Sequence, residues 1–210
     1  MKKTVIAMFG VLAAVLLVGQ RFGVLWAGGT GYISPVQVVI ADQVGAATVY
    51  RMDTSRLAAI GEEVVRGEMI VTGPETFARV AIGTQTELLL AQNSRVLIDN
   101  LTPGSVEIFL QAGRMHVLVA DRATAPTIRT GWTFTKPSVG ETAFVYYDFQ
   151  DTLVIAPLSE QPTAISLRAT NEGLVTQKPV SIHEVAPISI NDISFSPSAG
   201  DATTFFEWIQ

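Results

Sequence analysis

Gly61-Glu-Glu-Val-Val-Arg-Gly67-Glu-Met-Ile-Val-Thr-Gly73 is the stretch that decides how this sequence folds. Glycine recurs at every sixth position, and the apolar pairs Val64-Val65 and Ile70-Val71 lie between the glycines. Glycine adopts turn conformations that other residues adopt only at a cost, and valine and isoleucine favour strands. The stretch therefore predicts an all-β domain, and it does not point to a reaction.

Short apolar runs bounded by turn-forming residues continue outward from this stretch. Their spacing and their β-branched residues favour a multi-stranded antiparallel β-sandwich or roll, or a short β-helix, over alternating strands and helices. Only Asp53–Glu63 is predicted to hold a turn or two of helix, and Ala112-Gly113 is predicted to be a turn. The predicted strands are Val36–Ile40, Ala47–Arg51, Phe77–Ile82, Thr86–Leu90, Arg95–Ile98, Val106–Leu110, Met115–Ala120, Thr127–Thr130, Ala143–Tyr147, Thr152–Ile155, Ala164–Leu167 and Leu174–Thr176.

The composition excludes several classes of function. The 210 residues are enough for one domain with a real core. A net charge of −5 argues against a nucleic-acid partner, because phosphate binding requires a basic face. The chain has no cysteine, which excludes disulfides, thiolate metal sites and a cysteine nucleophile.

The N-terminal residues read as a membrane anchor. Lys2 and Lys3 precede the continuous apolar run from Thr4 to Gly19, which as a helix covers about 24 Å, and reading on to Trp26 gives a full span. We expect a single-pass anchor with a cytoplasmic N-terminus and the following residues outside. The alternative is a signal peptide that is cleaved to release a secreted protein.

The rest of the chain divides into segments of different composition. After an anchor or uncleaved signal at 1–27, residues 28–44 form a linker and first strand, and 45–180 form the β-domain. The extension 181–210 ends in the aromatic run Thr203-Thr-Phe-Phe-Glu-Trp-Ile209. That run is interpreted as a last strand docked on the domain, or alternatively as a segment that binds a partner or a sheet edge.

Residues 45–180 also resemble a known family in the order of their glycines and strands. Gly61, Gly67 and Ile70-Val-Thr-Gly73 match its opening, and Val139-Gly140-Glu141-Thr142-Ala143-Phe144-Val145 matches its Val-x-Gly-Thr-x-Phe-x-Val core with one extra residue. Asn171-Glu-Gly173-Leu-Val-Thr176 is similar to its closing turn and strand. This is the FecR domain family, the extracytoplasmic module of iron-dicitrate-type sensors. The resemblance implies a β-domain located outside the membrane.

The sequence departs from that family in two places. The family's sensors engage a sigma factor through a cytoplasmic segment ahead of the membrane helix, whereas Met1, Lys2 and Lys3 precede the apolar run here. We therefore do not expect sigma-factor control by that route. The family's glycine after a late strand is replaced by Ala156-Pro157-Leu158, which suggests altered strand pairing there.

Catalytic and metal-binding constellations are weak in this sequence. We expect no enzyme activity, no cofactor and no metal site. His116 alternates with Met115 and Val117 and is predicted to lie at the surface or rim of a strand. His183 beside Glu184 could bind a metal, but no carboxylate cluster accompanies the two histidines. Asp148 and Asp151 are interpreted as turn residues instead of an acid–base pair, and Ser138 and Ser181 lack the context of a nucleophile elbow.

The glycines and aromatic residues are interpreted as structural. In the aromatic-rich region, which also holds Phe134 and Phe149, alternation places Phe144 and Tyr146 on one face of a strand and Val145 and Tyr147 on the other. Core packing is favoured there over a ligand platform. The predicted structural glycines are Gly61, Gly67, Gly73, Gly83, Gly113, Gly140 and Gly173.

The sequence as a whole predicts a binding protein of the cell envelope. We expect a membrane-anchored sensory or scaffold module whose partner is an envelope protein or a surface polymer. The alternative is a structural component of the envelope or cell surface without a signalling role, which would self-associate edge to edge.

Overall fold

The computed structural model describes residues 36–102, 104–131, 133–147, 152–159, 163–168, 175–180, 184–189 and 198–199. The predicted anchor from Thr4 to Gly19, Gly173 and the aromatic run 203–209 lie outside these residues. Within the described ranges, no helix is long and apolar enough to cross a membrane. The described residues belong to one compact unit, Ser34–Gln210.

The described part of the chain is all-β, apart from a 3₁₀ turn, η1, at Arg122–Thr124. The strands are β1 (Val38–Val44), β2 (Thr48–Arg51), β3 (Thr54–Leu57), β4 (Met69–Val71), β5 (Phe77–Ile82), β6 (Thr86–Leu90), β7 (Arg95–Thr102), β8 (Ser105–Val119), β9 (Thr127–Thr130), β10 (Thr133–Lys136), β11 (Gly140–Tyr147), β12 (Thr152–Pro157), β13 (Thr163–Arg168), β14 (Val175–Val180), β15 (Glu184–Ser189) and β16 (Ser198–Ala199).

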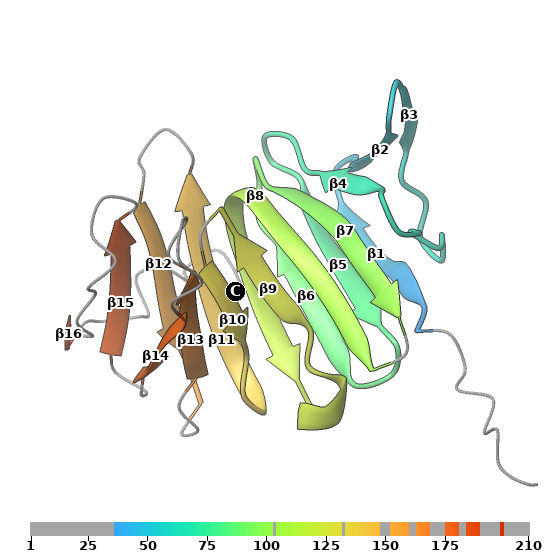
Figure 1. Ribbon diagram of the computed structural model, residues 1–210. Helices are drawn as coiled ribbons and strands as arrows, with labels where there is room; N and C mark the ends of the chain where they lie inside the picture. Colours follow the sequence, from blue (N-terminus) through green and yellow to red (C-terminus); the bar gives the residue numbers. More distant parts are fainter. Residues whose placement is uncertain are drawn as a thin grey trace, which may run out of the picture. The chain divides into compact units, whose positions relative to one another are not determined.

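Two sheets share the long strand β8 (Figure 1). Sheet A has the order β1-β5-β6-β8-β11-β12-β15, and β15 also pairs with β16. Sheet B has the order β3-β2-β4-β7-β8-β9-β10-β13-β14. Neighbouring strands are antiparallel, except that β9 runs parallel to β8 because the chain returns from sheet A to sheet B through η1. The paired strands extend outside residues 45–180, since β1 pairs with β5 and β15 pairs with β12.

The prediction of two strands separated by a turn at Ala112-Gly113 is wrong. β8 is one strand that continues through Gly113, which has a φ of 106°. Its first half pairs with β7 and β9, and its second half pairs with β6 and β11. Gly113 therefore lies where one strand passes from sheet B to sheet A, instead of at a chain reversal.

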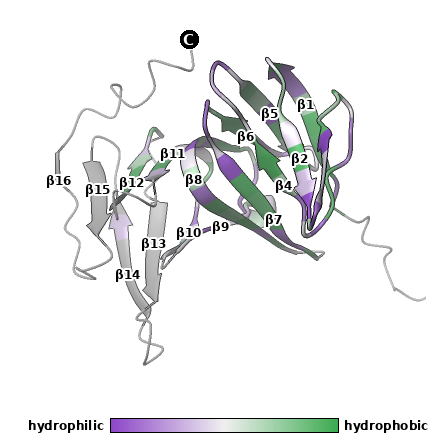
Figure 2. Ribbon diagram, turned by 90° about the horizontal axis from the view of Figure 1, so that it is seen from above, coloured by the Kyte–Doolittle hydropathy of each residue, from purple (hydrophilic) through white to green (hydrophobic). Residues whose placement is uncertain are grey.

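The core lies between the two sheets, whose strands form two layers when viewed from above (Figure 2). Alternate residues of strands such as β5, β6 and β9 are buried there, as the period of a half-buried strand requires. Phe144 and Tyr146 belong to this core, and Val145 is half-buried on the opposite face of β11, as alternation predicted. Further core residues from both sheets are Val38, Ile40, Val49, Ile70, Val96, Leu110, Val117, Ile128 and Ile155.

The helix predicted within Asp53–Glu63 is also wrong. Thr54–Leu57 is strand β3, which pairs with β2 to form a hairpin with Met52 and Asp53 at its tip. All four residues of β3 are exposed, so no alternation of buried and exposed positions marks them as a strand.

Strand pairing is regular at Ala156-Pro157-Leu158, where the absence of the family's glycine suggested altered pairing. β11 and β12 keep one register from Thr142 opposite Pro157 to Tyr147 opposite Thr152. The backbone N–H of Leu158 then donates to the carbonyl of Glu141 at 2.8 Å, so the ladder continues beyond the proline.

Candidate interaction surface

The glycine-rich stretch closes the side of the sandwich beyond β1 and β4. The N–H of Gly61 donates to the carbonyl of Ile40 at 2.8 Å, and the N–H of Ile40 donates to the carbonyl of Glu62 at 3.0 Å. Further along, the N–H of Gly67 donates to the carbonyl of Ile98 at 2.7 Å. The stretch therefore covers the outer edge of β1 before it joins sheet B, which protects that edge from pairing with another chain.

A buried carboxylate anchors this stretch to the β2–β3 hairpin. Glu68 is 3% exposed, and its two carboxylate oxygens accept from Nη1 and Nη2 of Arg56 at 2.8 and 3.0 Å. The N–H of Val65 also donates to Glu68, and the Arg56 guanidinium contacts Glu62 as well. The hydrogen bond from Arg56 lowers the pKa of Glu68, and these two carboxylates raise the pKa of Arg56. The guanidinium of Arg56 and the carboxylates of Glu62 and Glu68 thus pair with one another, and these pairs hold the glycine-rich stretch in place.

The predicted structural glycines in the described part of the chain have three different roles. Gly61, Gly67 and Gly83 have positive φ, and a Cβ added to any of them would meet no atom within 4 Å. The carbonyl of Gly73 accepts from the N–H groups of Thr76 and Asn93. Gly113 and Gly140 also have positive φ, and each allows a close approach. A Cβ on Gly113 would lie 2.4 Å from the Cα of Ser94, and one on Gly140 would lie 2.4 Å from the Cβ of Ser159.

His116 is buried, so its prediction as a surface or rim residue is wrong. It is 4% exposed, although the pattern of β8 places it on the outer face of sheet A. Its Nε2 lies 3.3 Å from Oε2 of Glu141. Burial lowers the pKa of His116, and the Glu141 carboxylate opposes that shift. The alternation predicted its face correctly but not its burial.

Most of the other chemical candidates fall outside the part of the chain that the structure describes. Ser138 is half-buried and lies outside the strands, and the residues Asp148, Phe149, Asp151, Ser181 and His183 lie outside the described part. In the described ranges, no group of three histidine or carboxylate residues is arranged to hold a metal ion.

The outer face of sheet B carries a continuous row of mostly apolar side chains. Strand registers place Tyr50 opposite Met69, Met69 opposite Leu97, and Leu97 opposite Phe109. Phe109 in turn lies opposite Arg129, and Arg129 lies opposite Phe134. At about 4.8 Å between strands, this row spans roughly 24 Å. We name these residues, Tyr50, Met69, Leu97, Phe109, Arg129 and Phe134, the sheet B row.

The sheet B row lies on the outer face, while its sequence neighbours are buried, except that Arg51 beside Tyr50 is exposed. Tyr50 is 39% exposed, and the other members are half-buried. The guanidinium carbon of Arg129 lies 4.4 Å from the centre of the Phe109 ring, and its Nη2 lies 2.9 Å from the carboxylate of Asp99. Stacking on Phe109 and pairing with Asp99 hold this arginine flat against the row, and the carboxylate of Asp99 balances its charge.

This row was not among the features predicted from the sequence. Its members are distributed from position 50 to position 134 and meet only through strand registers. A signal does exist in two of the strands, because Val96-Leu97-Ile98 and Ile108-Phe109-Leu110 are apolar at outward as well as inward positions. A strand with one solvated face would alternate there.

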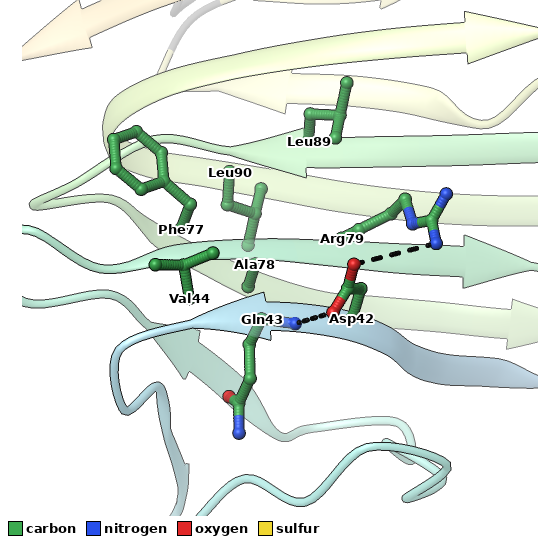
Figure 3. Close-up of a pocket in the computed structure, with 8 residues that line it drawn as sticks. All are labelled: Asp42, Gln43, Val44, Phe77, Ala78, Arg79, Leu89 and Leu90. Atoms are coloured by element: carbon green, nitrogen blue, oxygen red, sulfur yellow. Dashed lines mark hydrogen bonds and ion pairs between the residues drawn. The ribbon is translucent and has the colours of Figure 1, made fainter. Parts of the chain in front are cut away.

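An open depression of about 300 Å³ lies on the outer face of sheet A. Figure 3 shows Val44 and Phe77 at one end of it, the ion pair between Asp42 and Arg79, at 3.8 Å, at the other, and Leu89 on the neighbouring strand. Val44 is 64% exposed. Asp42 and Arg79 neutralise each other, and most of the other described residues that line the depression are apolar, so its chemistry suits an apolar side chain.

Comparisons with known proteins show a likeness in fold. No protein-family model matches the chain, and no curated protein matches its sequence. The chain is similar to two crystal structures of a candidate anti-sigma factor from Parabacteroides distasonis, at 2.50 and 1.65 Å resolution, with TM-scores of 0.55 and identities of 12% and 11%. The match covers 68% of this chain and 64% of each neighbour, so the chain spans less than two thirds of their length. The FecR resemblance itself stays a prediction.

Proposed function

We propose that this chain is an extracytoplasmic FecR-like domain, held at the membrane by residues 4–19, that acts in the cell envelope by binding another protein. The observation that carries the proposal is the sheet B row. Tyrosine, phenylalanine, methionine and arginine are the residues enriched at protein interfaces, and the row consists of them apart from Leu97.

The composition of the row favours a protein partner over a surface polymer. Sugars bind aromatic platforms by stacking, whereas Met69 and Leu97 occupy consecutive positions in the row. An apolar strip of this kind on a solvent-exposed face marks an interaction site. The similarity in fold to candidate anti-sigma factors supports a regulatory or sensory role for the binding.

Topology is the first test. A periplasm-active phosphatase fused after the last residue of the full chain is expected to be active, and a fluorescent protein that folds only in the cytoplasm is expected to be dark. The reverse pair of results would overturn the proposed location.

Partner capture is the second test. In native cells, Leu97→Glu in full-length protein is expected to abolish cross-linking to the partner, because a carboxylate in the row would be desolvated without a counterion. Leu118→Glu is the matched control, because Leu118 is 37% exposed on the outer face of sheet A. Equal loss with both variants, or loss with neither, would contradict binding through sheet B.

Edge strand β3 supports a second function, the structural assembly of copies. Its residues are all exposed, it pairs with β2, and it carries Leu57 at 71% exposure. Such an edge is a template for strand addition. A concentration-dependent oligomer that Leu57→Lys dissolves would favour this function, and a monomer at all concentrations would reject it.

A further inference from the structure

The outer face of sheet A is buried around His116, although Glu141, which contacts the imidazole, is itself exposed, and the cross-strand neighbours on β11 and β12 are alanines. His116 lies opposite Leu89 on β6 and Ala143 on β11, and Ala143 lies opposite Ala156 on β12. His116, Ala143 and Ala156 are 4%, 2% and 2% exposed. Alanine projects only a methyl group from a sheet, so it cannot close over a neighbouring imidazole. Two residues along β8, Leu118 on the same face is 37% exposed.

We propose that the aromatic run Thr203–Ile209 of this same chain docks on the outer face of sheet A over His116, Ala143 and Ala156. The inference is independent of the proposed function, because it concerns the opposite sheet from the sheet B row. It assigns the run to the domain's own surface instead of to a partner.

The chain length permits this docking. β16 ends at Ala199, and the strand order from there is β16-β15-β12-β11-β8. Four steps of about 4.8 Å place β8 roughly 19 Å from β16. Residues 200–210 in extended form reach about 36 Å, which is enough to pass over β12 and β11.

The chemistry of the two surfaces is complementary. The run offers Phe205, Phe206, Trp208 and Ile209, with Glu207 as its charged side chain. The face offers small and branched apolar side chains, and half-buried Arg114 lies on it beside Val145. Large aromatic rings over alanines give close packing, and the carboxylate of Glu207 and the guanidinium of Arg114 have opposite charges.

Cysteine pairs test the docking directly, because the chain has no cysteine of its own. In the full chain, Val145→Cys with Phe206→Cys is expected to form an intramolecular disulfide under mild oxidation, seen by mass spectrometry of the linked peptides. The control pair is Leu97→Cys with Phe206→Cys, because Leu97 lies on the outer face of sheet B. This pair is expected to stay reduced. The proposal would be overturned if both pairs formed a disulfide, if only the control did, or if neither did. It would also be overturned by linkage only between chains, a result that assigns the face to a second copy.

Accessibility of His116 provides an independent measurement. Diethylpyrocarbonate modifies exposed neutral imidazoles, and we expect slow modification of His116 in the full chain. Replacing Phe205, Phe206 and Trp208 by serine is expected to raise the modification rate towards that of a free imidazole, while the circular dichroism of the β-sheets is retained. An unchanged rate in the folded variant would show that something else covers the face.

Discussion

At the residue scale, the contact between Gly113 and Ser94 controls the passage of β8 between the sheets. The hydroxyl of Ser94 donates to the carbonyl of Arg114 at 2.9 Å and accepts from its N–H at 3.1 Å, while the Ser94 N–H donates to Thr72. Gly113→Ala adds a clash with the Ser94 backbone to a strained φ. We expect a loss of about 2–4 kcal/mol in the free energy of unfolding, measured by urea denaturation.

Gly83→Ala is the control for this prediction. Gly83 also has a positive φ, 58°, but a Cβ there would meet no atom within 4 Å. Its replacement is expected to cost about 1 kcal/mol, the strain alone. Equal losses for the two variants would contradict the role of the Ser94 contact.

The buried Glu68 predicts a non-additive pair of substitutions. Arg56→Met leaves a carboxylate at 3% exposure without its guanidinium, and we expect a loss of about 1–3 kcal/mol in the free energy of unfolding. The double variant Arg56→Met/Glu68→Leu removes both charges and is expected to lose less than Arg56→Met alone. Additive losses in a double-mutant cycle would show that the pair does not couple the hairpin to the loop.

His116 predicts a pH dependence of stability. Because burial lowers its pKa in the folded state, the unfolded chain binds more protons near the ordinary histidine pKa of about 6.5. The free energy of unfolding is therefore expected to fall as the pH decreases from about 7.5 to about 5.5. His116→Gln is expected to show a shallower dependence in parallel urea titrations, since His183 is present in both proteins. An identical slope would rule out His116 as the source.

At the scale of elements, the sequence predicts strands where burial alternates and fails where it does not. Phe77–Ile82 and Thr86–Leu90 have the predicted bounds, because both alternate on a half-solvated sheet. β3 is exposed at every position, and β4 is too short for a periodic pattern. Ala112-Gly113 was interpreted as a turn because glycine marks bends and reversals alike, and the contact with Ser94 lies far away in sequence.

The sharing of β8 predicts cooperative unfolding of the two sheets. Leu110 belongs to sheet B and Val117 to sheet A, and both are fully buried on one continuous strand. Native-state hydrogen exchange in increasing denaturant is expected to give their amides the same opening free energy. A lower opening free energy for one half would mean that the sheets open as separate units.

At the scale of the whole molecule, the sequence predicts the class of fold better than the candidate site. Local glycines and apolar runs are sufficient for an all-β sandwich, and the similarity to the anti-sigma structures agrees with that class. The sheet B row depends on five cross-strand registers, which join residues from position 50 to position 134. Local sequence marks β7 and β8 as apolar on both faces, but it does not show which side chains from the other strands join them.

The central claim is that sheet B binds another protein of the envelope, and photo-cross-linking in intact cells tests it most directly. In one variant of the full chain a benzophenone amino acid replaces Phe109. In a second variant it replaces Leu118, on the outer face of sheet A. We predict a discrete adduct with an envelope protein from position 109 and none of the same mass from position 118. The absence of an adduct at 109, or the same adduct from both positions, would contradict the claim.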